Sequence, residues 1–230
     1  MTDLLGDLAE RHISRRDALP DAIARALREA IFEGAFAPNE RLHQEDIAQK
    51  FGVSRVPVRE ALAKLVTEGL AVQRFNKGIR VAPLSRTDFQ DIMEMRLLLE
   101  PHALRLSAPH LTTLDYDDAE KILEQVRPSD LGTEAAVSHW TLHNRLYSAC
   151  GRPRLLAQIS SLQVAINRYV LPVWRSVGLS ADWDDTHSEI VDALRARNVD
   201  EAARMTGAQI EHAMHRMLEQ LPATVSMDDA

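Results

Sequence analysis

The stretch Gln44–Leu65 constrains the fold of this chain most, because it combines a helix end, a tight turn and a helix start within a few residues. Its first helical part ends before Gly52, a residue that suits a turn with positive φ. Ser54 can cap the helix that follows, and Pro57 falls in that helix's first turn, where a missing N–H costs little. Ala48 is small enough to let two helices cross closely. The pattern predicts two short helices joined by a sharp turn.

A further helix and a β-hairpin are predicted on either side of this stretch. Apolar residues recur at three- and four-residue steps from Leu19 to Ile31, and Gly34 suits the end of that helix. After Gly69, two short strand-like runs enclose the turn Phe75–Gly78, which is typical of a hairpin. Three helices followed by a hairpin predict a winged helix-turn-helix over residues 18–82. Residues 1–17 have no long period and are expected to form a flexible arm or a short helix.

The remainder is predicted to be all-helical, so the expected fold class is mainly α, with an N-terminal winged helix-turn-helix and a C-terminal helical bundle. Pro101 and Pro172 lie inside helical stretches and are expected to kink or locally break them. The expected divisions are a hinge at 83–86, a helical domain at 87–221 and a frayed tail at 222–230. The predicted helices cover about 85–107, 112–126, 133–149, 152–176, 183–196 and 199–220.

Charge is unevenly distributed along the chain. The formal net charge is −7, yet residues 50–80 contain seven Lys and Arg against only Glu60 and Glu68. DNA affinity depends on local neutralisation of phosphates rather than on the charge of the whole chain. This basic segment is therefore compatible with a DNA-binding surface, although a solvated charged face would have the same composition.

Cysteine usage and hydropathy indicate the compartment. The single cysteine, Cys150, excludes an intramolecular disulfide and is typical of a reducing environment. No uncharged apolar run approaches the roughly 20 residues of a membrane span, and the N-terminal residues do not resemble a signal peptide. A cytoplasmic protein with no membrane partner is therefore expected.

Two arginines mark the expected DNA-reading face. Arg55 and Arg59 are four residues apart near the start of the predicted helix and share one side of it. A recognition helix presents this end to the major groove, where arginine can bind guanine or hold a phosphate. Asn76, Lys77 and Gly78 suit a wing tip that touches the minor groove or the backbone. Two amphipathic helices with surface arginines are the structural alternative.

The segments Gly34–Leu42 (GAFAPNERL) and Gly52–Leu62 (GVSRVPVREAL) resemble the GntR family of bacterial repressors. The resemblance covers about residues 18–82 and implies that Ser54, Arg55 and Arg59 contact double-stranded DNA, with assistance from the wing. A homodimer with two recognition helices would bind a palindromic operator.

Two positions depart from the GntR pattern. The family usually has Thr-Pro where this chain has Val56-Pro57, so Val56 would offer DNA an apolar contact, for example to a thymine methyl group. The family usually has Pro-Gly where this chain has Pro38-Asn39, a change that affects a turn.

Histidines are the distinctive feature of the C-terminal half. His139 and His143 are four residues apart on a predicted helix, so both side chains point the same way. His187 lies on a later helix, and Gln209 lies on the last one. Three imidazoles with a water or a carboxylate would make a zinc, nickel or manganese site. Judged from the residues alone, a histidine pair with this spacing is more often incidental.

A second resemblance covers about residues 87–215. The motifs Arg96-x-x-Leu99-Glu100, Leu142-His143-x-x-Leu146 and His187-x-x-Ile190 are similar to the FCD ligand-binding domain, which defines the FadR subgroup of the GntR family. The resemblance implies an effector cavity in which one aspartate and three histidines hold a divalent metal and small carboxylates bind beside it. An organic or sugar acid is therefore the expected effector.

This chain departs from the FCD pattern at two of the four metal positions. His139 stands where the aspartate is expected, and Gln209 stands where the third histidine is expected, as a weak fourth ligand or a hydrogen-bonding group. Three imidazoles can still hold a metal, or protonated histidine and Arg96 can bind an anionic effector directly. The effector-site candidates are Arg96, His139, His143, His187 and Gln209, and the metal candidates are the three histidines.

The last helix contains two further histidines. His212 and His215 fall on other faces of the last helix and are expected to face solvent or a neighbouring helix. A three-histidine metal could activate water in a hydrolase. Against this, no well-placed general base accompanies the histidines, although Asp185 and Glu189 are sequence neighbours of His187. An architectural DNA-binding protein without an effector is the other alternative. The favoured function is a transcription regulator, expected to be a repressor and not an enzyme.

Overall fold

The computed structural model describes residues 4–12, 18–75, 77–125, 133–177 and 183–221. The chain divides into two compact units, Met1–Leu84 and Ser85–Ala230, and the division falls inside the segment expected to be the hinge. Each unit has its own buried apolar residues. Within the described residues, no helix is both long enough and apolar enough to span a membrane.

The described residues of the first unit form four helices and a two-stranded antiparallel sheet. The region expected as a flexible arm or a short helix is helical in its described part, because Leu5 and Leu8 are buried and α1 packs against α2. The elements are α1 (Leu4–His12), α2 (Leu19–Phe32), α3 (Gln44–Phe51), α4 (Arg55–Thr67), β1 (Ala71–Arg74) and β2 (Gly78–Val81).

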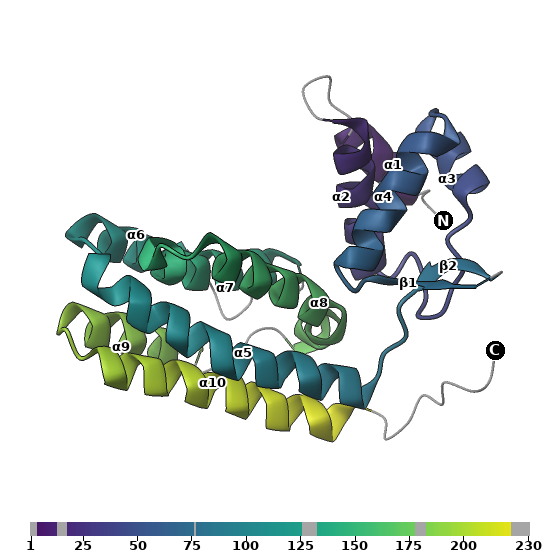
Figure 1. Ribbon diagram of the computed structural model, residues 1–230. Coiled ribbons are helices and arrows are strands. Elements are labelled where there is room, and N and C mark those ends of the chain that lie inside the picture. The colour runs from purple at the N-terminus through teal and green to yellow at the C-terminus, as the bar shows by residue number, and fades with distance from the viewer. Residues whose placement is uncertain (1–3, 13–17, 76, 126–132, 178–182, 222–230) are drawn as a thin grey trace. The chain divides into compact units, whose positions relative to one another are not determined.

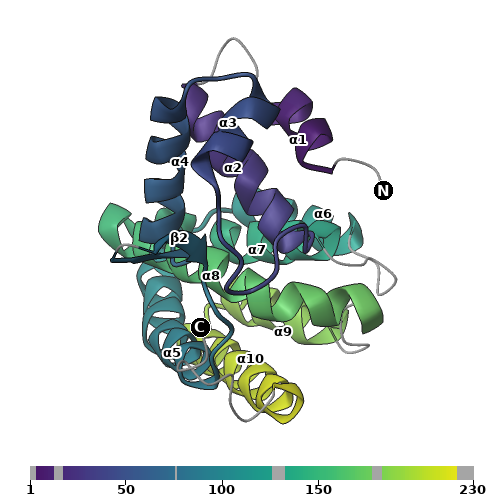
Figure 2. The same ribbon diagram turned by 90° about the vertical axis from the view of Figure 1, so that its right-hand side faces the viewer.

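The core of the first unit forms where α2 packs against α4 (Figure 2). Ile23 and Leu27 of α2 and Leu62 and Leu65 of α4 are fully buried. Their three- and four-residue spacing places them on one side of each helix, which is why the periodicity of the sequence predicted both elements. Burying an aliphatic side chain of this size contributes about 1.5–3 kcal/mol relative to leaving it exposed.

The hairpin is extended by the chain that precedes α3. In the hairpin, Ala71 pairs with Val81 and Arg74 pairs with Gly78. The Val81 N–H donates to the carbonyl oxygen of Glu40 at 2.9 Å. Asn39 has a φ of 67°, a left-handed conformation that glycine and asparagine tolerate best. This explains why asparagine can stand where the GntR pattern has glycine.

In the second unit, the part of the chain that the structure describes is a bundle of six helices with two short 3₁₀ turns. Its predicted helices all occur, with ends that differ by at most two residues. Helices α5 and α8 continue through Pro101 and Pro172, so neither proline breaks its helix. The elements are α5 (Arg86–Ser107), η1 (Ala108–His110), α6 (Thr113–Gln125), α7 (Thr133–Tyr147), η2 (Ser148–Cys150), α8 (Pro153–Val177), α9 (Trp183–Arg195) and α10 (Val199–Gln220).

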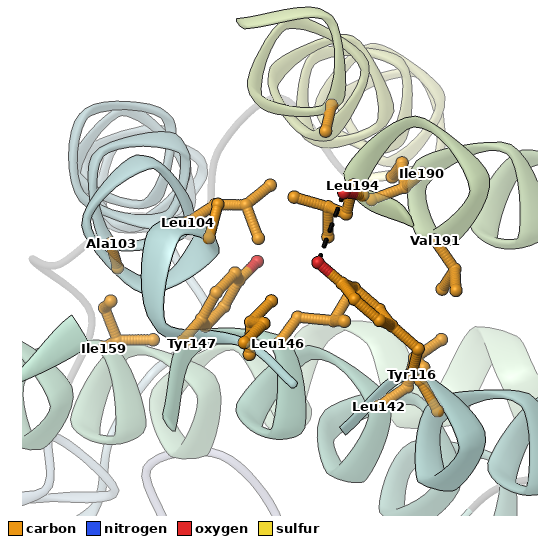
Figure 3. Close-up of a cluster of buried hydrophobic side chains, with 14 residues drawn as sticks. Ala103, Leu104, Tyr116, Leu142, Leu146, Tyr147, Ile159, Ile190, Val191 and Leu194 are labelled. Atoms are coloured by element: carbon orange, nitrogen blue, oxygen red, sulfur yellow. Dashed lines mark hydrogen bonds between the residues drawn. The ribbon is translucent and has the colours of Figure 1, made fainter. Parts of the chain in front are cut away.

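Helix α5 is central to the packing of the bundle. It lies alongside α10 (Figure 1) and also packs against α7 and α8. Figure 3 shows part of the buried cluster, with Leu104 of α5 near Tyr147 of α7. The Tyr116 hydroxyl donates to the carbonyl oxygen of Leu194 at 3.2 Å, joining α6 to α9. This packing brings side chains from several helices to one buried polar site.

Candidate DNA-binding surface and effector site

The turn between α3 and α4 has the geometry that its sequence predicts. Gly52 ends α3 with a φ of 62°, and the Val53 N–H donates to the Ala48 carbonyl oxygen at 3.0 Å. A Cβ at Gly52 would meet no atom within 4 Å, so glycine is favoured there by backbone conformation alone. Ser54 occupies the N-cap position of α4, but its side chain makes no cap hydrogen bond, contrary to expectation.

The first turn of α4 has one buried and one exposed side. Val58 is fully buried, whereas Ser54, Arg55 and Arg59 are exposed and Val56 is 53% exposed. An Arg55 guanidinium nitrogen lies 2.5 Å from a carboxylate oxygen of Glu45, and both side chains are largely exposed. An exposed ion pair of this kind is weak, so a DNA phosphate or a guanine can replace Glu45.

The wing adds an exposed aromatic residue that the sequence did not single out. Lys77 is exposed, and Gly78 has a φ of 79° with space for a Cβ limited by the Arg41 side chain at 3.3 Å. Phe75 is 91% exposed beside this turn. In the sequence, Phe75 lies between the basic residues Arg74 and Lys77 of the hairpin, and this position could have identified it as a wing residue. The third predicted wing residue, Asn76, lies outside the described residues.

Three histidines that are far apart in the sequence lie together in the second unit. His139 and His143 come from α7 and His187 comes from α9, and one ring nitrogen of each lies within 4.8 Å of the others. The ring centroids of His143 and His187 are 5.1 Å apart. Helical spacing places the first two side by side, and the tertiary fold adds the third. The structure thus brings together the three predicted metal candidates.

A chain of hydrogen bonds fixes the orientation of His143. Arg96 Nε donates to Glu100 Oε1 at 2.6 Å, and the Tyr147 hydroxyl donates to Glu100 Oε2 at 3.0 Å. The Tyr147 oxygen lies 3.0 Å from His143 Nδ1. Because the one hydroxyl proton is used for Glu100, His143 must donate its Nδ1–H to this oxygen. The lone pair of His143 is therefore on Nε2, the nitrogen that faces His187.

Arg96 and His143 were predicted as site residues, whereas Glu100 and Tyr147 were not. Each missed residue lies four positions after its partner on the same helix, so spacing was the available signal. Glu100 and Tyr147 are fully buried. A buried carboxylate requires a cation and hydrogen-bond donors, which Arg96 and Tyr147 supply.

Burial keeps the imidazoles of α7 neutral. It lowers the pKa of His143 to about 3, and the positive charge of Arg96 acts in the same direction. Burial also holds the pKa of His139 well below its usual value, with smaller contributions from His143, His187 and Arg96. Burial and Glu100 raise the pKa of Tyr147 well above its usual value, so the hydroxyl keeps its proton. Neutral imidazole is the form that coordinates metals.

The neighbouring polar side chains differ in their relation to this cluster. The Arg96 guanidinium lies 4.8 Å from the centre of the Trp140 ring, and Trp140 Nε1 donates to Asn167 Oδ1 at 2.8 Å. Gln209 Nε2 lies 3.5 Å from His187 Nδ1, the ring nitrogen that does not face His143. Among the remaining candidates, His212, His215 and Glu189 are exposed, and the side chain of Asp185 lies outside the described residues.

The three imidazoles fit a divalent metal ion. His143 Nε2 and His187 Nε2 are 3.2 Å apart. Two nitrogen ligands of a tetrahedral zinc ion are separated by about 3.3 Å when each Zn–N distance is about 2.0–2.1 Å. The bond from Tyr147 to His143 is the kind of outer contact that orients a metal-binding imidazole. The donor chemistry therefore suits a divalent metal ion at His139, His143 and His187, and burial keeps the two imidazoles of α7 neutral.

Comparison with known proteins assigns each unit to a family. The model for bacterial regulatory proteins of the gntR family matches residues 19–81, and the FCD domain model matches residues 91–220. The Nta operon transcriptional regulator of Aminobacter aminovorans is 30% identical over 195 residues, covering 83% of this chain and 90% of the relative. The transcriptional repressor GlaR of Escherichia coli is 28% identical over 202 residues, covering 79% and 87% of the two chains.

Solved structures support the fold. The structure of E. coli McbR/YncC has a TM-score of 0.70 at 22% identity and covers 89% of this chain and 98% of its own. A putative GntR regulator from Rhodococcus sp. RHA1 has a TM-score of 0.67 at 24% identity, covering 88% and 99%. The FCD match alone spans more than half of the sequence. This chain belongs to the GntR family of bacterial transcription regulators, in the FCD-containing FadR subgroup, and is an effector-controlled DNA-binding protein rather than an enzyme.

Proposed function

We propose that this regulator is a homodimeric repressor whose helical unit binds a small organic or sugar acid beside a divalent metal ion. The observation that carries the proposal is the convergence of His139, His143 and His187, without a carboxylate among them. Three neutral ligands leave the charge of a divalent ion uncompensated, so an anionic further ligand is favoured. Imidazole ligands suit zinc and nickel better than manganese, which prefers oxygen.

Direct binding of an anion by protonated histidine has less support. A pKa of about 3 leaves His143 neutral at physiological pH. The charge of Arg96 is already paired with Glu100. A site without metal would therefore offer an anion little uncompensated positive charge, whereas a metal-loaded site would attract one strongly.

The exposed side of α4 supports the assignment of DNA contacts. Ser54, Arg55, Val56 and Arg59 are on the surface of the first turn of α4, where a recognition helix contacts base edges. Two such helices related by a twofold axis would bind two half-sites of a palindromic operator. The E. coli relative that is named a transcriptional repressor supports repression. Action on chromosomal DNA implies a cytoplasmic protein.

Helix α8 offers a physical connection between the effector site and the end of the hinge. Its Asn167 accepts a hydrogen bond from Trp140, which lies against Arg96. Tyr169 lies two residues further along α8 on a different side of the helix, and its hydroxyl donates to Asp88 at 2.6 Å and accepts from the Ser85 N–H at 3.2 Å. An effector that binds one arrangement of α8 more tightly would shift the population of the DNA-binding units.

The metal is tested first by elemental analysis of protein purified without a His-tag or a chelator. One equivalent of zinc or nickel per chain is expected after incubation with the ion. His143→Gln should abolish this uptake, and His212→Gln, which changes an exposed histidine on α10, should not. Uptake well below one equivalent by the wild-type chain would refute the metal site.

The effector is then sought by thermal-shift screening of the metal-loaded protein with small organic and sugar acids. The expected result is stabilisation by a subset of acids and none by the corresponding amides. Equal stabilisation by an acid and its neutral amide would contradict the proposed role of the metal.

The DNA contacts are tested with an operator selected from a random-sequence library by the full chain. Arg55→Ala and Arg59→Ala should each weaken binding at least tenfold while the circular dichroism spectrum is unchanged. Arg154→Ala removes the same charge from an exposed position on α8 and serves as the control. Unchanged operator affinity in both α4 variants at constant salt would refute their assignment.

A further inference from the structure

Gln209 has an unpaired amide oxygen beside the histidine cluster. Its Nε2 lies 3.5 Å from His187 Nδ1, while its Oε1 is buried and has no hydrogen-bond partner in the described part of the chain. A buried acceptor without a partner is costly and uncommon in native proteins. The unpaired oxygen belongs to the same amide that contacts a titratable ring, so rotation of that amide would exchange a donor for an acceptor.

The hydrogen bonds that link Gln209, His187, His143, Tyr147 and Glu100 run in one direction. Gln209 Nε2 and the Thr186 hydroxyl each lie 3.5 Å from His187 Nδ1 and both can donate to it, so in this arrangement the proton of a neutral His187 ring is on Nε2. His187 Nε2–H then donates to His143 Nε2, 3.2 Å away. His143 Nδ1–H donates to the Tyr147 hydroxyl, and Tyr147 donates to Glu100. In this arrangement the lone pair of His143 accepts a proton from His187. Both ring nitrogens of His143 and of His187 therefore have hydrogen-bond partners without a metal.

Metal coordination requires a different position for one proton. When the Nε2 lone pairs of His143 and His187 are both used for coordination, His187 must have its proton on Nδ1. An Nδ1–H needs an acceptor. The Thr186 hydroxyl can accept from it, whereas the Nε2 of Gln209 is a donor that would face the new N–H. A half-turn of the Gln209 amide places Oε1 at this nitrogen, which removes the opposition of two donors and provides a second acceptor. The same rotation gives the unpaired oxygen its partner.

We propose that Gln209 is a positioning residue for His187 whose amide rotates by half a turn between the metal-free and metal-bound forms, and that it is not a metal ligand. This inference rests on the metal site in the proposed function. A glutamine serves both forms because its amide has a donor and an acceptor at equal reach. Outer contacts of this kind commonly change metal affinity by 10- to 100-fold.

The first test measures the zinc affinity of the full chain by competition with a chromophoric chelator. Gln209→Leu, which removes both amide atoms, is expected to weaken zinc binding about 10- to 100-fold. Gln209→Glu restores the acceptor and should recover most of this loss. Gln220→Leu, at an exposed position on the same helix, should have no effect. Equal affinity of the wild type and Gln209→Leu would overturn the inference while leaving the metal site in place.

The second test separates a positioning role from a direct ligand. With cobalt in place of zinc, the absorption bands of Gln209→Leu should match those of the wild type, because the coordinating atoms are unchanged. A shifted or weakened band would show that Gln209 is a ligand and would overturn the inference.

The third test uses the wild-type chain alone, so it does not depend on the folding of any variant. Nitrogen-15 NMR of the histidine rings should locate the His187 proton on Nε2 without metal and on Nδ1 with zinc. A proton on Nδ1 in both forms would overturn the inference. Failure of the wild type to bind zinc at all would refute the metal site and the inference together.

Discussion

Replacement of Glu100 by leucine gives the most direct energetic test of the buried polar chain. Glu100 is 0% exposed and Arg96 is 5% exposed, and their side chains are joined at 2.6 Å. Glu100→Leu would leave the Arg96 charge buried without its partner. It would also remove the acceptor of the Tyr147 hydroxyl. The free energy of unfolding of the second unit should therefore fall.

The expected loss can be bounded from the burial of the pair. Breaking a buried ion pair by removing one partner costs about 3–5 kcal/mol. With a urea m-value of about 2 kcal/mol/M, the unfolding midpoint would fall by about 1.5–2.5 M. Replacing both charges in Arg96→Met/Glu100→Leu should recover much of the loss, because no uncompensated charge is then buried.

Tryptophan fluorescence during urea unfolding is a suitable assay. All three tryptophans, Trp140, Trp174 and Trp183, belong to the second unit, so the signal reports its unfolding separately from that of the first. Glu201→Gln breaks a surface pair with Arg204 and should leave the midpoint unchanged. If Glu100→Leu lowered stability by less than about 1 kcal/mol, or if the double variant were less stable than the single one, the reasoning would be refuted.

Three further predictions concern other parts of the chain. In metal-free protein, the folded-state pKa of His143, about 3, lies below the unfolded value of about 6.5. The neutral imidazole therefore contributes fully to the free energy of unfolding above about pH 6.5, and this stabilisation is lost as the pH falls toward 3. Urea midpoints measured in chelator between pH 7 and 4 should show this decline, and His143→Gln should make it shallower. Tyr169→Phe removes the hydroxyl that joins α8 to Ser85 and Asp88, so it should lower the stability of the second unit by about 1–3 kcal/mol in the fluorescence assay. An unchanged midpoint would exclude a structural role for that hydroxyl. Gly52→Ala should destabilise the first unit by about 1–2 kcal/mol through backbone strain alone, measured as a lower melting temperature by circular dichroism. A larger loss of stability would contradict this reasoning, because the open surroundings of Gly52 leave no atom for the new Cβ to clash with.

Local sequence patterns were sufficient for most of the fold. The helices of the second unit were predicted to within two residues at each end, because apolar periodicity and nearby glycine or proline residues define them. The two helices that meet at Gly52 were predicted for the same reason, since a residue with positive φ strongly limits the local backbone. Pro101 and Pro172 show where local rules were too strict, because packing along α5 and α8 keeps both helices continuous.

The histidine cluster was only partly predictable. The i,i+4 spacing of His139 and His143 places both on one side of α7 whatever the rest of the chain does. The family resemblance, and not any local rule, suggested that His187 would join them. The loss of the expected carboxylate at position 139 was also visible in the sequence, and so was the glutamine at position 209.

Only the tertiary structure decided how these groups interact. Spacing could not reveal that Tyr147 would link His143 to Glu100, because that link needs α5 and α7 at hydrogen-bond distance. Nor could it reveal that Gln209 would lie behind His187 with its amide oxygen unpaired. Backbone preferences depend on a few adjacent residues, so the local sequence determines them. The protonation, tautomer and pairing of buried side chains depend on which helices pack together and on how completely they exclude water.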